Sequence, residues 1–371
     1  LKFGVVLGGI LAFLYAFTTI YLIGNQTINS FSGIGMSIFI FLILFIVFFA
    51  LFFILFSGID SLARYYWQEK FHSFDALKKG YFFAKKIQHD LNVPVGMINS
   101  SWGGTSAESW TPAESINNNE VLKTASEKLT EVPWGPVKPG INYNGMIAPV
   151  TNYTIAGALW YQGEANVTTN STYAELLITM IDSWRAKWNK EFPFYYVQIA
   201  PFNYGNNNIG ALLQEQQSKV MSHPKTGMVV ITDQIDSVSN IHPSDKREVG
   251  KRLANWALGD TYKQHIPEYK SPVFKNAVLN KNKLELSVDN APNGLMAKGK
   301  TITGFFISGE KEAWLPAEAK IENDKIIVWN KTLKVPAQVR YGFGNTIIGN
   351  VFNKEGLPLV PFRTDNWPAD K

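Results

Sequence analysis

The chain has 371 residues, enough for two domains with buried cores, and its 46% hydrophobic and 14% aromatic content excludes a disordered polypeptide. The formal net charge is +5, and because lysine and arginine are scattered along the chain, we expect no nucleic-acid-binding surface. The sequence contains no cysteine, which excludes disulfides, thiol catalysis and cysteine-ligated zinc.

The N-terminal segment is strongly apolar, and Lys2 is its only charged residue before Asp60. Residues 3–23 and 34–56 are apolar runs, each long enough to cross a bilayer, which takes about 20 residues. The segment therefore predicts a hairpin of two transmembrane helices. Since Lys2 precedes the first run and Arg64 follows the second, the positive-inside rule would place the rest of the chain in the cytoplasm.

The following segment, 61–265, alternates helical and strand patterns. The predicted helices cover residues 77–91, 173–188, 209–221 and 246–257, and the predicted strands cover 95–98, 155–159, 194–200 and 227–232. This alternation is typical of a mostly parallel sheet with helices on both faces, which is a three-layer α/β fold.

The last segment, 266–371, has a different pattern. Short stretches of alternating hydrophobicity are separated by Asn, Asp, Gly and Pro, and they cover residues 283–288, 304–308, 325–329 and 338–343. Such stretches predict a small C-terminal antiparallel β domain. The expected organisation is therefore three segments, 1–60, 61–265 and 266–371.

A dense polar cluster follows the predicted strand at 155–159. It contains Gln162, Gly163 and Glu164, with Asn166 directly beyond. In open α/β sheets, ligands bind where the strands end at their carboxyl edge. The cluster is therefore a candidate binding site, and the alternative is an ordinary polar turn after a buried strand.

Two other loops carry candidate chemistry. Gly103 and Gly104 would let the backbone approach a ligand closely and present its N–H groups, or they form only a tight turn. His242 follows a strand end with aspartates nearby, and histidine accepts and returns protons near neutral pH. His242 is therefore a candidate general base, and the alternative is a solvated loop residue.

Several sequence blocks resemble the sialate O-acetylesterase family, which belongs to the SGNH (GDSL-type) hydrolases. The blocks read I-N-S-S-W-G-G-T, N-G-M-I-A-P, G-A-L-W-Y-Q-G-E-A-N, P-F-Y-Y-V-Q-I-A-P-F and I-H-P-S-D-K-R-E-V-G-K-R-L-A, and the C-terminal segment N-K-E-G-L-P-L-V-P-F-R-T-D-N-W is also similar. They occur in the family's order between about Gly80 and Trp367. The resemblance implies an SGNH-type hydrolase fold and a carbohydrate esterase that removes O-acetyl groups from glycans.

The resemblance also implies roles for individual residues. His242 would activate a serine and later protonate the leaving alcohol. The backbone N–H groups of Gly103 and Gly104, with the side chain of Gln162, would hold the oxyanion. Ser239 stands where the family usually has the aspartate that orients the histidine, so we expect Asp236 to take this role, with Asp233 as the alternative.

The expected ligand is an acetylated carbohydrate, with no cofactor and no metal. Glu164 and Asn166 are the polar candidates for substrate binding. Trp102, Trp110 and Trp160 could stack against a sugar, or they could pack in the core, which is the commoner position for an aromatic ring. Of the three, Trp102 is the candidate for substrate binding.

The nucleophile has no assignment. The family carries it in a G-Q-S-N-M-like block that this sequence does not contain. Ser61 lies in a superficially GDSL-like stretch, whereas Ser100 and Ser101 lie in the block that supplies oxyanion contacts. The protein is therefore expected to be either an esterase or a catalytically silent glycan-binding protein.

Two interpretations of residues 1–60 stay open. The segment is a membrane hairpin, or it is a frame-shifted or chimeric reading. The family resemblance implies a periplasmic or extracellular protein, which conflicts with the positive-inside orientation, and a genuine hairpin would make the protein membrane-associated. A functional role for the hairpin itself is disfavoured, because it contains no intramembrane charge of the kind that marks transport paths.

Overall fold

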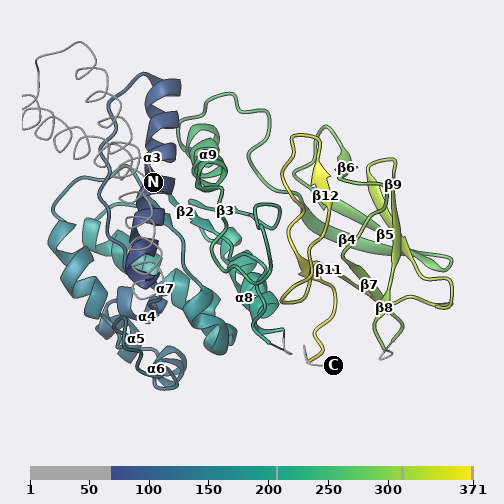
Figure 1. Ribbon diagram of the computed structural model, residues 1–371, viewed down its shortest axis with the longest axis horizontal. Coiled ribbons are helices and arrows are strands. Elements are labelled where there is room, and N and C mark those ends of the chain that lie inside the picture. Colours follow the sequence, from purple (N-terminus) through teal and green to yellow (C-terminus); the bar gives the residue numbers. More distant parts are fainter. Residues whose placement is uncertain (1–67, 206–207, 311–312, 369–371) are drawn as a thin grey trace, which may run out of the picture. The chain divides into compact units, whose positions relative to one another are not determined.

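The computed structural model describes residues 68–205, 208–310 and 313–368 (Figure 1). The chain divides into two compact units, Leu1–Phe71 and His72–Lys371, and the second contains nearly all of the described residues. The predicted hairpin lies outside the described residues. Within the described part, no helix has both the length and the apolar character needed to cross a bilayer. The predicted division at residues 265 and 266 stays a prediction.

A parallel sheet forms the centre of the first half of the second unit. Its strands are β1 (Ala158–Trp160), β2 (Phe194–Val197) and β3 (Thr226–Val229), in the order β1-β2-β3. β2 pairs in parallel with both neighbours, and all four of its residues are buried. All residues of β2 and β3 are buried, which fits a parallel sheet covered on both faces, as the sequence predicts.

Helices pack on both faces of this sheet. They are α3 (Gln68–Leu91), α4 (Ala107–Trp110), α5 (Ala113–Asn117), α6 (Glu120–Ser126), α7 (Tyr173–Trp188), α8 (Ile209–Lys219) and α9 (Lys246–Trp256). Because successive strand residues point to opposite faces, Tyr196 joins one apolar cluster with Ile181 of α7. Tyr195 joins another cluster with Ile87 of α3 and Leu253 of α9.

Several shorter helical segments connect these elements. They are the π-helices η1 (Tyr143–Ile147) and η5 (Ala257–Thr261), and the 3-10 helices η2 (Ala148–Val150), η3 (Glu164–Thr172) and η4 (Val220–Ser222). Among them, η3 begins at Glu164, the last residue of the polar cluster after β1. α3 begins at Gln68, well before the predicted start at residue 77.

The predicted strand at residues 95–98 is wrong. These residues form no ladder, and Met97 and Ile98 are 46% and 51% exposed. A strand exists only through pairing, and among the described residues β1 pairs with β2 alone. Val95 nevertheless packs against the same apolar cluster as Leu159, so the segment is a loop that contacts this core.

The C-terminal strands, green to yellow in Figure 1, form antiparallel sheets, as the sequence predicts. One sheet has the order β4 (Val273–Asn280), β5 (Lys283–Asp289), β10 (Lys325–Trp329), β9 (Glu318–Glu322). The next has the order β13 (Phe362–Arg363), β11 (Gln338–Tyr341), β7 (Phe305–Ser308), β8 (Leu315–Pro316), and β12 (Val351–Asn353) pairs with β6 (Leu295–Ala297). Alternate residues of β5, Leu284 and Leu286, enter the core of this region.

Candidate active site

The polar turn after β1 is fixed tightly against α8. A Cβ atom on Gly163 would lie 2.6 Å from Ile199 and 2.8 Å from Leu213, so no larger residue fits there. The turn begins immediately after the buried Trp160, at the carboxyl end of the strand. This is the edge at which open α/β sheets bind ligands.

Gln162 is held by three side-chain hydrogen bonds. Its Nε2 donates to the carbonyl oxygen of Thr105 at 3.1 Å and to Oδ1 of Asn166 at 2.7 Å. Its Oε1 accepts from the hydroxyl of Tyr173 at 2.9 Å. Both amide hydrogens are therefore engaged, and the predicted oxyanion role of Gln162 requires that it release one of these acceptors.

Asn166 links this turn to the short helix α4. Its side chain is fully buried, its Oδ1 also accepts from the backbone N–H of Ala107, and its Nδ2 donates to the carboxylate of Glu108 at 2.8 and 3.1 Å. Burial raises the pKa of Glu108, and the hydrogen bonds from Asn166 oppose this rise. Asn166 thus connects buried groups in this structure, while its predicted role in binding substrate stays a prediction.

The paired glycines lie beside this network. Gly104 has a φ of +72°, a left-handed conformation that glycine adopts without steric cost. Thr105 fixes the turn, because its hydroxyl donates to the carbonyl of Trp102 and its own carbonyl accepts from Gln162. Within the described residues, no hydrogen bond uses the backbone N–H of Gly103 or Gly104. The structure therefore brings the three predicted oxyanion residues together.

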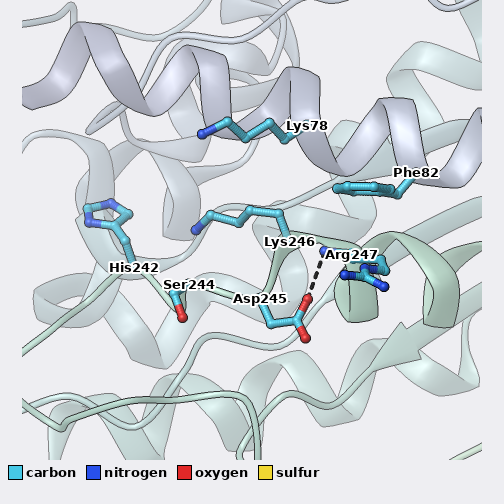
Figure 2. A pocket seen from close by; sticks show the side chains of 7 residues that line it. All are labelled: Lys78, Phe82, His242, Ser244, Asp245, Lys246 and Arg247. Atoms are coloured by element: carbon cyan, nitrogen blue, oxygen red, sulfur yellow. Dashed lines mark hydrogen bonds between the residues drawn. The ribbon is translucent and has the colours of Figure 1, made fainter. Parts of the chain in front are cut away.

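His242 lies in the loop between β3 and α9 and lines a pocket of about 460 Å³ (Figure 2). The pocket is lined by Lys78, Phe82, His242, Ser244, Asp245, Lys246 and Arg247. Lys78 and Phe82 extend from α3, and the ammonium groups of Lys78 and Lys246 lie toward the imidazole of His242 (Figure 2). Asp245 caps α9 by accepting from the backbone N–H groups of Arg247 and Glu248, both at 3.0 Å.

Glu164 connects the strand edge to the His242 loop electrostatically. Burial raises the pKa of its carboxyl group, and the positive charges of Lys79 and Lys246 oppose this rise. The ammonium of Lys79 lies 3.6 Å from the ring centre of Tyr161, and Lys246 donates to the carbonyl of Pro243. Lys246 also lines the His242 pocket, so the same ammonium group acts on Glu164 and borders the predicted general base.

The two candidate aspartates differ in their surroundings. Asp233 forms two hydrogen bonds of 2.7 Å with Arg252, and these lower its pKa although burial acts to raise it. Asp236 is exposed and forms no hydrogen bond or ion pair within the described residues. Neither carboxylate hydrogen bonds to the imidazole of His242, so Asp236 as its orienting residue stays a prediction.

Ser100 and Ser101, the candidate nucleophiles among the described residues, donate their hydrogen bonds to groups other than His242. Ser100 Oγ donates to the carbonyl of Met146 at 2.7 Å, and Ser101 Oγ donates to Oδ1 of Asn99 at 3.1 Å. Ser61 lies outside the described residues. The nucleophile therefore keeps no assignment, and among the described residues no group of three or more histidines and carboxylates could hold a metal ion.

The tryptophans divide into core and surface residues. Trp110 and Trp160 are 3% and 8% exposed and pack edge to face in the core, whereas Trp102 is 46% exposed. Sequence reasoning missed Glu108, because its contact with Asn166 joins residues 58 positions apart. It also missed Trp134, an exposed tryptophan whose carbonyl accepts from the indole N–H of Trp102.

Comparison with known proteins establishes the class. A family described as carbohydrate esterase, sialic acid-specific acetylesterase, matches residues 65–259, which is more than half of the 371-residue chain. The chain belongs to this family, and the resemblance drawn from its motifs is confirmed.

Individual relatives agree with this assignment. The chain is 26% identical to mouse sialate O-acetylesterase, and the match covers 71% of this chain and 58% of the mouse protein. It is 28% identical to human sialate O-acetylesterase, and the match covers 64% of this chain and 49% of the human protein. A crystal structure of a carbohydrate acetylesterase from Xanthomonas citri is similar with a TM-score of 0.69 and 36% identity, covering 78% of this chain and 65% of that one. The chain thus spans about half of the length of the curated relatives it matches.

Proposed function

We propose that this protein hydrolyses O-acetyl esters of carbohydrates, with sialic acids and related glycans as the substrate class. The observation that carries the proposal is the pair of backbone N–H groups on Gly103 and Gly104, which no described hydrogen bond uses. They lie in a turn bound to Gln162, at the carboxyl edge of a parallel sheet. A preorganised N–H pair of this kind can stabilise the oxyanion of an acyl-transfer reaction.

The proposed chemistry has two steps. A serine hydroxyl attacks the acetyl carbonyl carbon while His242 accepts its proton, and the oxyanion accepts hydrogen bonds from the glycine N–H groups. The carbon–oxygen bond to the sugar then breaks, and the sugar oxygen takes the proton from His242. Water attacks the acetyl-serine, again giving a proton to His242, which returns it to the serine. The balance is one ester and one water to one acetic acid, which ionises to acetate and a proton, and one sugar hydroxyl.

The proposal also includes an SGNH-type fold for the first domain and a cellular location for the protein. We infer a three-layer SGNH-type domain over residues 61–265 because helices pack on both faces of the β1–β3 sheet, and we infer that it is incomplete at its start because the family's nucleophile block is absent from the sequence. A periplasmic or extracellular location rests on the family resemblance alone, and residues 1–60 would hold the protein at a membrane if they form the predicted hairpin. Protease added to cells whose outer membrane has been removed should then digest the globular part, and its protection by the inner membrane would contradict this location.

A catalytically silent glycan-binding protein is the alternative function. The observation that favours it is that Ser100 and Ser101 both donate to other acceptors, and neither hydrogen bonds to His242. In this case the polar cluster and the pocket would still bind an acetylated sugar, but no acetyl-enzyme would form.

The experiment uses the full chain, two O-acetyl compounds and one N-acetyl control compound. Acetate release is measured from 9-O-acetyl-N-acetylneuraminic acid and from acetylated xylan, with N-acetylneuraminic acid as the amide control. The proposal expects acetate from the O-acetyl compounds and none from the N-acetyl compound. Absence of acetate from every O-acetyl compound would overturn it, and saturable sugar binding without acetate release would establish the alternative.

A further inference from the structure

We propose that Trp102 and Trp134 together form a stacking subsite that binds the sugar ring of the ester substrate. This inference rests on the proposed function for the identity of its ligand. Trp102 and Trp134 are 46% and 45% exposed. Such large apolar rings on a surface mark interaction sites when they are held together in one place.

The polar atoms of both indoles are already satisfied. Trp102 Nε1 donates to the carbonyl of Trp134 at 2.8 Å, and Trp134 Nε1 donates to the carbonyl of Gly104 at 3.2 Å. Neither side chain needs water as a hydrogen-bond acceptor for its N–H group. The surface that each presents to solvent is therefore mainly its apolar ring, and the two hydrogen bonds fix the rings relative to the turn.

The loop that contains Trp134 packs closely against the turn formed by Gly103 and Gly104. Val132 and Gly135 form a bridge, so Trp134 lies in the tight turn between them. A Cβ atom on Gly135 would lie 2.7 Å from Cγ2 of Thr105 and 3.1 Å from Nε1 of Trp102. Only glycine at this position lets the loop pack so closely.

The position of the rings determines the ligand. Trp134 is bound to Gly104, the residue whose N–H is proposed to hold the oxyanion, and Thr105 links the same turn to Gln162. An acetyl group at this turn places the sugar it esterifies beside the two indoles. A pyranose ring has an apolar face of C–H groups and hydroxyls at its edge, which suits stacking on an indole. The subsite therefore selects esters of ring-shaped sugars over small acyclic esters.

The test compares two substrates and four variants of the full chain. The substrates are an acetylated xylo-oligosaccharide and ethyl acetate, and the variants are Trp134→Ala, Trp134→Phe, Trp102→Ala and Tyr153→Ala. Tyr153 is the matched control, because it is 64% exposed and precedes the amino end of β1, opposite the site. The measured quantity is the ratio of the two kcat/KM values.

The expected result is a fall of about tenfold in this ratio for Trp134→Ala and for Trp102→Ala, arising mainly from KM of the sugar ester. Trp134→Phe keeps an aromatic ring but loses the hydrogen bond to Gly104, so its ratio of kcat/KM values should stay close to that of the wild type. Tyr153→Ala should have the wild-type ratio. An unchanged ratio in both alanine variants would overturn the subsite. So would an equal loss in Trp134→Phe and Trp134→Ala, because the hydrogen bond and not the ring would then matter.

A binding measurement separates the subsite from the esterase activity. The same oligosaccharide after deacetylation is titrated into the wild-type chain while tryptophan fluorescence is followed. We expect a saturable change that Trp134→Ala loses and Tyr153→Ala keeps. If no acetate is released from either ester but this change occurs, the esterase proposal fails and the subsite stands. If the wild type shows no saturable change, the subsite is overturned.

Discussion

Buried polar groups serve different purposes in the parallel β1–β3 region and in the antiparallel region that follows it. In the first region, Glu108 is buried against the amide of Asn166 with no cation among its hydrogen-bond partners, and its pKa is raised. In the second region, Asp365 is buried against Arg340 with two hydrogen bonds of 2.7 and 2.8 Å, and its pKa is lowered. Both carboxyl groups lose hydration on burial. Burial favours the neutral form of Glu108 although the amide of Asn166 opposes this, whereas the guanidinium of Arg340 stabilises the charged form of Asp365.

The difference also concerns where each network ends. The amide network runs from Glu108 through Asn166 and Gln162 to a turn whose N–H groups are not used by any described hydrogen bond. The ion pair is enclosed, because the Arg340 guanidinium lies 4.1 Å from the ring centre of Trp314 and Asp365 also accepts from the backbone N–H of Trp367. We infer that the first network supports the proposed oxyanion turn and that the second stabilises the fold.

Breaking the ion pair should give the largest change in stability. Asp365→Asn leaves the guanidinium of Arg340 buried without its counter-charge, and we expect the free energy of unfolding to fall by about 3–5 kcal/mol. Urea unfolding of the full chain measures this loss. Adding Arg340→Met should recover part of it. If Asp365→Asn instead lowers kcat while leaving stability unchanged, the second network is not merely structural.

Breaking the amide network should give a smaller loss of stability together with a loss of activity. Asn166→Ala removes the acceptor for Gln162 and the donor for Glu108, and we expect it to cost about 1–3 kcal/mol in unfolding free energy. Because Gln162 also holds the glycine turn, acetate release should fall as well. Urea unfolding and initial rates check the two effects. A variant that unfolds earlier but keeps the wild-type rate would separate this network from the site.

The smallest expected effect is a change in the pH dependence of stability. The pKa of Glu108 is raised above its ordinary value of 4.5, so the folded state holds this proton more tightly than the unfolded state. Its contribution to stability is complete below pH 4.5 and is lost as pH rises through the folded pKa. Glu108→Gln cannot lose a proton at this position, so it should not show this loss of stability. The free energy of unfolding of the variant should therefore increase relative to that of the wild type as pH rises.

Unfolding midpoints of the two proteins between about pH 4 and pH 8 measure this difference. The contribution of Asp365 to stability changes with pH in the opposite direction. Its pKa is lowered below 3.8, so this contribution is lost as pH falls. Both proteins contain Asp365, so its contribution cancels in the comparison. A difference between variant and wild type that stays constant over this pH range would contradict the account of Glu108.

The sequence predicts the parallel sheet well and the contacts of the site poorly. Buried apolar runs such as Phe194–Val197 identify strands locally, and the rule that ligands bind at strand ends singles out Gln162, just after β1. The structure adds the hydrogen bond from Gln162 to Thr105, beside the Gly103–Gly104 turn. Residues 95–98 have the same apolar character, but a strand also needs a neighbour, which no local pattern reveals.

The hydrogen-bond partners of side chains also cannot be predicted from local sequence. Asp233 and Asp236 look alike as partners for His242, yet Asp233 is bound by Arg252 from the following helix. Glu108 and Asn166 lie in two recognisable blocks, but their hydrogen bonds depend on how α4 packs against the turn after β1. The sequence identifies the segments that carry the chemistry, and only packing decides which atoms meet.

The central claim is that the proton transfers of ester hydrolysis pass through His242. The direct measurement is the initial rate of acetate release from an O-acetylated sugar by the full chain and by His242→Ala, with the exposed His265→Ala as the matched control. We expect His242→Ala to lower the rate by about 10²–10⁴-fold with an unchanged unfolding midpoint, and His265→Ala to leave both unchanged. A rate for His242→Ala within twofold of the wild type would contradict the account.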